Sequence, residues 1–152
     1  MRTLLAIDPG LHSCGISLWN NGSLVNAALV PNLDSTWTGM ALGIKEYIAS
    51  FLTYVSNGVI EIPQVYRHGK GDPEDLIQLA GVCGAIKGVL GGSWTDVKPR
   101  EWKGQVPKEV MVQRIQKKLS TIEIGAVVLP QKSLAHNVWD SVGIGLWSLG
   151  RL

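Results

Sequence analysis

The pattern of apolar and polar positions predicts three strands near the start of the chain. Residues 3–8 contain the apolar run Leu4–Ile7, which is typical of a strand buried on both faces. Residues 15–19 alternate like a second strand, and residues 23–30 continue as a third. Asn21 and Gly22, which lie between the second and third strands, favour a type I′ hairpin turn. The chain therefore begins with an antiparallel meander.

The rest of the pattern predicts helices that alternate with short strands. The expected elements are a helix over about 38–55, a strand over 59–62, a helix over 73–90, a strand over 94–97, a helix over 107–119 and a helix over about 134–149. Asp72 and Ser133 suit the N-caps of two of these helices. Pro73 suits a first helical position, and Pro107 opens the helix that follows the fifth strand.

This order of elements predicts an α/β fold. A meander followed by alternating helices and strands fits a five-stranded mixed sheet with helices on both faces. The sequence contains no linker, repeat or low-complexity stretch, so we expect residues 1–152 to form a single domain.

The composition is typical of a soluble globular protein. Hydrophobic residues make up 45% of the sequence and charged residues 17%, which excludes a disordered chain. No apolar run reaches the roughly 20 residues that a membrane span needs, and Met1–Ile7 is too short for a secretory signal. Cys14 and Cys83 lie in apolar contexts without metal-ligand spacing, and we interpret them as reduced core residues of a cytoplasmic protein.

Two carboxylates stand where apolar strands end. Asp8 follows the run Leu4–Ile7, and the next two residues, Pro9 and Gly10, stop the strand. Glu61 lies in the short strand over 59–62. Asp8 alone is equally well explained as a turn cap, and Glu61 as a partner of an arginine. If the two strands are neighbours, however, both carboxylates lie at one edge of the sheet, where a cation would offset the cost of burying them.

The last predicted helix adds a third carboxylate, Asp140. His136 precedes it by four residues and Asn137 by three, so both share a helix face with it. Carboxylates are preferred ligands of Mg²⁺ and Mn²⁺, and two such ions suit phosphodiester hydrolysis. His136 suits Mn²⁺ or proton transfer better than it suits Mg²⁺. The three acidic residues together predict a site for two divalent ions.

Basic residues are concentrated between positions 98 and 118. Seven of the chain's 14 lysines and arginines lie there against two acidic residues, which gives a local charge of +5. Such a run is equally typical of a solvated helix face. Trp102 among these cations favours a nucleic-acid surface, because aromatic rings and cations together suit bases and phosphates.

These segments resemble the RuvC family of Holliday junction resolvases, within the RNase H-like superfamily. The matching pieces, in the family's order, are I-D-P-G at 7–10 with Gly15, I-E at 60–61, L-A-G-V-C-G at 79–84, V-K-P at 97–99, the helix start at Lys108, and H-N-V-W-D-S-V-G-I-G-L at 136–146. The resemblance implies an RNase H-like fold in which Asp8, Glu61 and Asp140 bind metal and catalyse hydrolysis. It also implies that Lys98 and Lys108 approach the DNA backbone, and that the protein acts as a homodimer on a four-way junction.

The sequence departs from the family pattern at two places. The family has Asp or His three residues before the final Asp, where this chain has Asn137; we favour His136 over Asn137 as the further metal ligand and catalytic residue. In the loop after Glu61 the family carries an aromatic wedge, for which Tyr66 is the local candidate. The same loop supplies the basic candidates Arg67, His68 and Lys70. These departures suggest a member of a phage or mobile-element type.

The main hypothesis is therefore a Mg²⁺- or Mn²⁺-dependent endonuclease that makes paired nicks in Holliday junctions. Its expected phosphate contacts are Lys98, Arg100, Lys103, Lys108, Arg114 and Lys118. Two alternatives stay open: an RNase H-like nuclease acting on flaps or RNA–DNA hybrids, and a branched-DNA-binding protein with a weak or lost activity. A fragment of an actin-like ATPase is disfavoured, because the chain has only one D-P-G turn.

Overall fold

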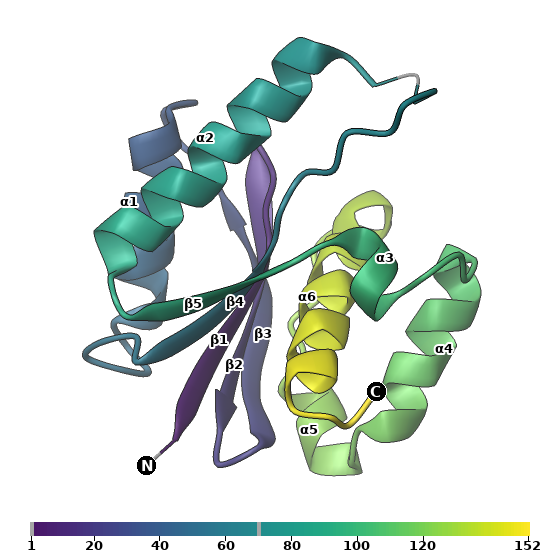
Figure 1. Cartoon of the computed structure of the whole chain (residues 1–152). Coiled ribbons are helices and arrows are strands. Elements are labelled where there is room, and N and C mark those ends of the chain that lie inside the picture. Colours follow the sequence, from purple (N-terminus) through teal and green to yellow (C-terminus); the bar gives the residue numbers. More distant parts are fainter. Residues whose placement is uncertain (1, 70) are drawn as a thin grey trace.

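The computed structural model describes residues 2–69 and 71–152, which form one mixed sheet between two layers of helices (Figure 1). The strands are β1 (Thr3–Asp8), β2 (Ser13–Asn20), β3 (Ser23–Pro31), β4 (Asn57–Glu61) and β5 (Ser93–Val97), in the sheet order β3-β2-β1-β4-β5. β1 pairs with β2, and β2 with β3, in antiparallel fashion, whereas β4 is parallel to both β1 and β5. The predicted α/β fold with a five-stranded mixed sheet is confirmed.

Helices cover both faces of the sheet. Helices α1 (Trp37–Ile48) and α2 (Pro73–Leu90) pack on one face, and α4 (Lys108–Lys118) and α6 (Ala135–Ser148) lie on the other (Figure 1). The short helices are α3 (Pro99–Trp102), α5 (Thr121–Gly125) and the 3₁₀ turn η1 (Lys132–Leu134). Within the described part of the chain, none of the helices has the length and apolarity that a membrane span requires.

Several local predictions are confirmed. Asn21 and Gly22 adopt positive φ angles of 49° and 83°, as a type I′ turn between β2 and β3 requires. The Asp72 side chain caps α2 by accepting a hydrogen bond from the Glu74 amide at 2.9 Å. Cys14 and Cys83 are free thiols in the core, and burial raises the pKa of each to about 12.

Other local predictions were wrong at helix ends. Helix α1 ends at Ile48 and not near Val55, because the chain must turn back to enter β4 at Asn57. Pro107 does open α4, as its N-cap, and the helix ends at Lys118, one residue before the predicted end. Ser133 lies inside η1 and does not cap α6, whose N-cap has no side-chain hydrogen bond.

Helix α6 lies unusually close to the sheet. A Cβ atom at Gly15 of β2 would collide with the main-chain oxygen of Asn137, and one at Gly145 would collide with the Trp19 ring. The Ser17 hydroxyl donates a hydrogen bond of 2.8 Å to the main-chain oxygen of Ser141. Gly15 in β2 and Gly145 in α6 therefore set the distance between α6 and the sheet, and with it the position of Asp140.

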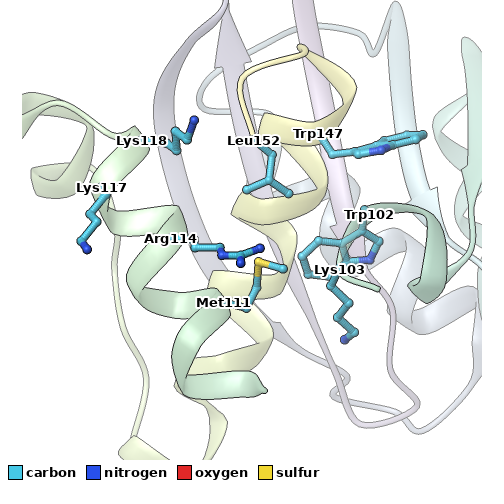
Figure 2. A pocket seen from close by; sticks show the side chains of 8 residues that line it. All are labelled: Trp102, Lys103, Met111, Arg114, Lys117, Lys118, Trp147 and Leu152. Carbon is cyan, nitrogen blue, oxygen red and sulfur yellow. The ribbon is translucent and has the colours of Figure 1, made fainter. Parts of the chain in front are cut away.

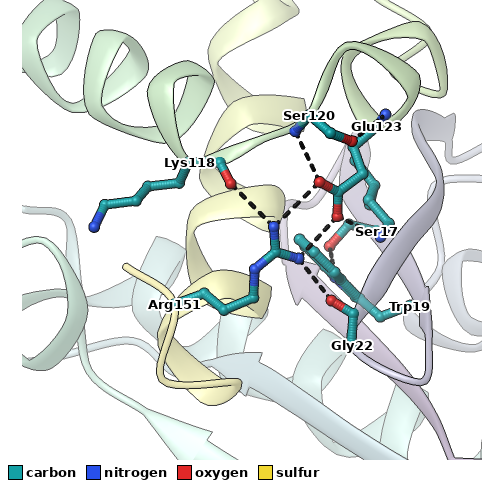
Figure 3. Close-up of polar contacts among 8 residues, drawn as sticks. Ser17, Trp19, Gly22, Lys118, Ser120, Glu123 and Arg151 are labelled. Carbon is teal, nitrogen blue, oxygen red and sulfur yellow. Dashed lines mark hydrogen bonds and ion pairs between the residues drawn. The ribbon is translucent and has the colours of Figure 1, made fainter.

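A polar network anchors the C-terminal segment beside the β2–β3 hairpin (Figure 3). This hairpin adjoins the start of β1, at the end opposite Asp8. Arg151 donates to Glu123 Oε1 and Oε2 at 2.8 and 3.1 Å, to the Gly22 carbonyl at 2.6 Å and to the Lys118 carbonyl at 3.0 Å. Glu123 also accepts hydrogen bonds from the amides of Ser120 and Leu24. These contacts join α5, the β2–β3 hairpin and the end of the chain.

Candidate metal centre and nucleic-acid interface

The parallel pairing of β1 and β4 brings Asp8 and Glu61 to the same edge of the sheet. Ile7 is the register partner of Ile60, so the two carboxylates occupy the next positions on neighbouring strands. Both strands end there, and both acidic side chains project from a rigid apolar core. The convergence expected from the sequence is confirmed.

Asp140 reaches the same place from the opposite direction. It lies in α6, which packs across β1 and β2, and only 8% of its surface is exposed. Its charge raises the pKa of Asp8 and of Glu61, so the three carboxylates lie within electrostatic reach of one another.

Burial and the neighbouring carboxylates both act against ionisation of the acidic groups at this site. Burial raises the pKa of Asp8 well above its ordinary value, and repulsion from Asp140 and Glu61 raises it further. Burial also raises the pKa of Glu61, although a hydrogen bond from Trp102 and the charge of Lys103 act against this rise. A divalent cation bound among the three groups would offset both the burial and the repulsion.

Two residues from the end of α3 contact the carboxylates directly. Trp102 Nε1 donates a hydrogen bond of 2.6 Å to Glu61 Oε2. Lys103 Nζ lies 3.3 Å from Asp140 Oδ2 and 4.9 Å from the centre of the Trp102 ring. Burial alone would lower the pKa of Lys103, but Asp140 and Glu61 more than compensate, so its pKa is raised.

The donor set fits Mg²⁺ or Mn²⁺ by its chemistry, although it is not assembled as a ligand cluster. Among residues 2–69 and 71–152, no three His, Cys, Asp or Glu side chains are arranged closely enough to hold an ion. Asp8, Glu61 and Asp140 nevertheless supply oxygen donors of the kind that both metals prefer. In this arrangement, Trp102 and Lys103 bind two of the three carboxylates.

Helix α6 also carries the two side chains that compete for the further ligand position. His136 and Asn137 lie in the first turn of the helix, and both residues are partly buried. No hydrogen bond to either side chain is present in the described part of the chain. Asn137 is constrained through its main chain, whose oxygen lies against Gly15. Both residues lie in the turn of α6 that precedes Asp140, and Gly15, against which Asn137 packs, is the register partner of Asp8.

The basic residues divide into two groups. Lys103 and Lys108 lie near the carboxylates, because both lower the pKa of Asp8. Lys98, which the family resemblance places beside the site, is an exposed residue before α3, and it is not among the charges that shift the pKa of Asp8 or Glu61. Arg100, Arg114 and Lys118 are exposed on α3 and α4.

A groove extends from Lys103 along α4 and the end of α6 (Figure 2). It has a volume of about 440 Å³ and is lined by Trp102, Lys103, Met111, Arg114, Lys117, Lys118, Trp147 and Leu152. Arg114 points across the groove toward Met111 and Leu152, whereas Lys117 and Lys118 point outward. All four charged residues of the lining are cationic, which suits an anionic strand.

The loop after Glu61 places its aromatic and basic residues on the surface. Tyr66 is 42% exposed, and the Arg100 guanidinium lies 5.0 Å from the centre of its ring. Arg67 and His68 are exposed, while Lys70 lies outside the described residues. The Tyr66–Arg100 contact joins this loop to the basic segment.

The role first inferred for Trp102 was wrong. The basic residues around it favoured a surface ring that stacks on bases, yet Trp102 is only 5% exposed and packs in the core beside α6. Sequence reasoning also missed its bond to Glu61, since these residues are 41 positions apart.

Comparison with solved structures identifies the same architecture in known proteins. RuvC of Thermus thermophilus, solved in complex with a Holliday junction substrate, is similar with a TM-score of 0.69 and 17% identity over 96% of this chain and 91% of that chain. The fowlpox virus resolvase with junction DNA gives 0.64 and 14% over 98% and 97%, and the yeast mitochondrial resolvase Ydc2 gives 0.61 and 13% over 96% and 77%. No protein-family description matches the sequence, and no curated protein does. The chain therefore shares the RuvC-like fold at low sequence identity.

Proposed function

We propose that this protein is a metal-dependent endonuclease that resolves Holliday junctions by paired, symmetric nicks. The observation that carries the proposal is the convergence of Asp8, Glu61 and Asp140 at one sheet edge of a RuvC-like fold. Solved proteins with this fold include resolvases bound to junction DNA. We also propose that the protein acts in the cytoplasm, where Cys14 and Cys83 would stay reduced.

Asp8, Glu61 and Asp140 would hold Mg²⁺ or Mn²⁺, in a pair of ions, with His136 favoured over Asn137 as a further ligand. Bound metal would supply the positive charge that activates water and stabilises the departing 3′ oxygen. The protein itself contributes rigid strand ends, which fix Asp8 and Glu61, and a closely packed helix, which fixes Asp140. Rigid support of this kind holds a catalytic constellation in its productive geometry.

The basic residues would hold the DNA backbone beside these carboxylates. Lys103 and Lys108 lie nearest to them, so we assign these two to the phosphates that flank the cut. Exposed Lys98, Arg100, Arg114 and Lys118 would follow the strand further along α3 and α4. Arg67 and His68, in the loop that contacts Arg100 through Tyr66, would add phosphate contacts, and Lys70 remains a candidate from the sequence alone. Tyr66 at the tip of that loop is our candidate for a residue that wedges into the branch point. Binding that depends on so many phosphate contacts weakens steeply with salt.

Two matched cuts require two active sites, so we propose that the protein acts as a homodimer. An apolar hollow of about 730 Å³ lies between the loop after Glu61 and the start of α2. In this hollow Val65 is 78% exposed and Ile77 58% exposed. A second copy would cover both side chains and would set two loops beside each other at the branch point.

The decisive experiment is cleavage of a mobile four-way junction in Mg²⁺ and in Mn²⁺, with cuts mapped on all four strands. Paired nicks at symmetric positions, lost in Asp8→Asn and Glu61→Gln, are the expected result. Undiminished cutting by either variant would contradict the site. Preferred cutting of a flap or an RNA–DNA hybrid would favour the alternative nuclease, and tight junction binding without cleavage in either metal would favour a binding protein.

A further inference from the structure

Trp102 connects the two sides of the carboxylate site. Its indole N–H donates to Glu61 Oε2 at 2.6 Å, while its ring packs against α6, the helix that carries Asp140. The bond joins the end of β4 to the end of α3 across 41 residues of sequence. Figure 2 shows the ring at the inner end of the basic groove, directly beside Lys103.

The orientation of the indole is fixed by its neighbours. A Cβ atom at Gly143 would collide with the six-membered ring of Trp102, so the absence of a side chain there makes room for the indole. Met111 and Ile115 of α4 and Val142 of α6 belong to the same core cluster. With 5% of its surface exposed, Trp102 cannot rotate its N–H away from Glu61 without opening this part of the core.

The chemistry of the donor suits a metal ligand. An indole N–H is a neutral donor that cannot accept a hydrogen bond, so it satisfies one carboxylate oxygen without adding a positive charge. Lys103, by contrast, places a full positive charge beside Asp140. A neutral donor on Oε2 leaves Glu61 negatively charged and its second oxygen, Oε1, available to a cation.

We propose that Trp102 is a positioning residue for Glu61: its indole N–H holds Oε2 and leaves Oε1 free to bind a divalent cation, which Asp8 and Asp140 would also hold. The inference rests on the proposed function, because it concerns the same metal centre. Hydrogen-bond partners of metal ligands of this kind commonly change metal affinity by about 10–100-fold.

The main test is Mn²⁺ binding to the full chain without DNA, followed by the electron paramagnetic resonance signal of free Mn²⁺. Trp102→Phe keeps a ring in the core and removes the donor, and we expect Mn²⁺ affinity to fall about 10-fold. Trp94→Phe is the matched control, because Trp94 Nε1 donates to the Gly91 carbonyl at 2.7 Å, away from the carboxylates. Trp94→Phe should leave Mn²⁺ affinity unchanged. Unchanged affinity in folded Trp102→Phe would overturn the proposal.

A double-mutant cycle separates positioning from general structural support. In the Glu61→Gln background, Trp102→Phe should weaken Mn²⁺ binding little further, because the carboxylate that it positions is already absent. An equal loss in both backgrounds would show a merely structural role and would overturn the proposal. If Glu61→Gln alone leaves Mn²⁺ affinity unchanged, the proposed metal site fails, which is a different result from the failure of Trp102 alone.

A second measurement needs no substitution of Trp102. In a ¹⁵N–¹H spectrum of the wild-type protein, one indole N–H resonance should shift when diamagnetic Mg²⁺ is added. The same resonance should move in metal-free Glu61→Gln, because its acceptor has lost its charge. If no indole resonance responds to Glu61→Gln, the hydrogen bond is not present in solution and the proposal is wrong.

Discussion

Lys103 Nζ lies 3.3 Å from Asp140 Oδ2, so the protein itself supplies a positive charge beside the carboxylate site. The Lys103 side chain is 30% exposed, which leaves it a route to solvent and to a DNA phosphate. A lysine that pairs with a metal ligand opposes metal binding by repulsion and favours phosphate binding by attraction. Removing the charge of Lys103 should therefore raise the affinity for the metal ion and lower the affinity for DNA.

We predict that Lys103→Met strengthens Mn²⁺ binding by the free protein about 3–10-fold, as expected for the loss of one nearby positive charge. The same substitution should weaken junction binding and reduce the slope of log affinity against log salt by about 1. Mn²⁺ titration and filter binding at several salt concentrations measure the two effects. Lys87→Met, which breaks a pair with Asp96 outside the site, is the control and should change neither. Weaker Mn²⁺ binding by Lys103→Met would contradict this account.

Asp8→Asn should stabilise the metal-free protein while abolishing cleavage. Burial and two neighbouring carboxylates raise the pKa of Asp8 well above its ordinary value of 3.8, so its ionised form destabilises the fold. We expect the Tm in EDTA to rise by about 2–5 °C, and the rise in Tm on adding Mg²⁺ to be reduced. Differential scanning fluorimetry with and without Mg²⁺ makes the comparison, with exposed Glu46→Gln as the control. A lower Tm in EDTA would argue against the repulsion.

The sign of the pH dependence follows from the same shift. A carboxyl with a raised folded pKa binds its proton more readily in the folded chain, so Asp8 ceases to destabilise the protein as pH falls through that raised pKa. The stability advantage of Asp8→Asn in EDTA should therefore be largest at neutral pH and shrink in mildly acidic buffer. An advantage that grows on acidification would show that Asp8 is not the group responsible.

The sequence was informative where chemistry conflicted with a strong local pattern. Asp8 and Glu61 each interrupt an apolar strand, and parallel neighbours necessarily bring such ends together, so their convergence was predictable. The contacts of Trp102 with Glu61 and of Lys103 with Asp140 were not predicted, because α3 has only four residues and gives no helical periodicity. The end of α1 was predicted too far along the chain for a different reason. Val55 continues the apolar spacing of the helix and is buried in the core, but it lies in the irregular segment between α1 and β4.

His136 and Asn137 can be separated by the choice of metal. Imidazole binds Mn²⁺ better than Mg²⁺, whereas an amide oxygen accepts either. We expect His136→Ala to reduce Mn²⁺-supported cleavage at least 10-fold and more than Mg²⁺-supported cleavage, and Asn137→Ala to have a smaller, metal-independent effect. Initial rates over a range of each metal test this. A larger loss for Asn137→Ala would assign the position to Asn137.

The apolar hollow makes a specific prediction about assembly. Ile77 is 58% exposed on α2 and lines the hollow, so Ile77→Glu should place a charge in the proposed dimer interface. Analytical ultracentrifugation should show a shift from dimer to monomer, and paired nicks should give way to single nicks. Leu42→Glu, at a 51% exposed apolar position on α1 that does not line the hollow, is the matched control. A monomeric wild-type protein that still makes paired nicks would contradict the dimer.

Glu123 should control acid stability without affecting the nuclease site. A hydrogen bond from Arg151 is the largest effect that lowers the pKa of Glu123, from 4.5 to about 2, with further help from main-chain amides (Figure 3). Because the folded pKa is depressed, this stabilisation is present above pH 4.5 and is lost as pH falls toward 2. We expect Glu123→Gln to lower the free energy of unfolding by about 3 kcal/mol at pH 7, and this difference to narrow steadily between pH 4.5 and 2. Urea titrations across that range measure the difference, while junction cleavage at pH 7 and low temperature should match the wild type. A stability difference that is constant with pH would show that packing, and not the charge of Glu123, provides the stabilisation.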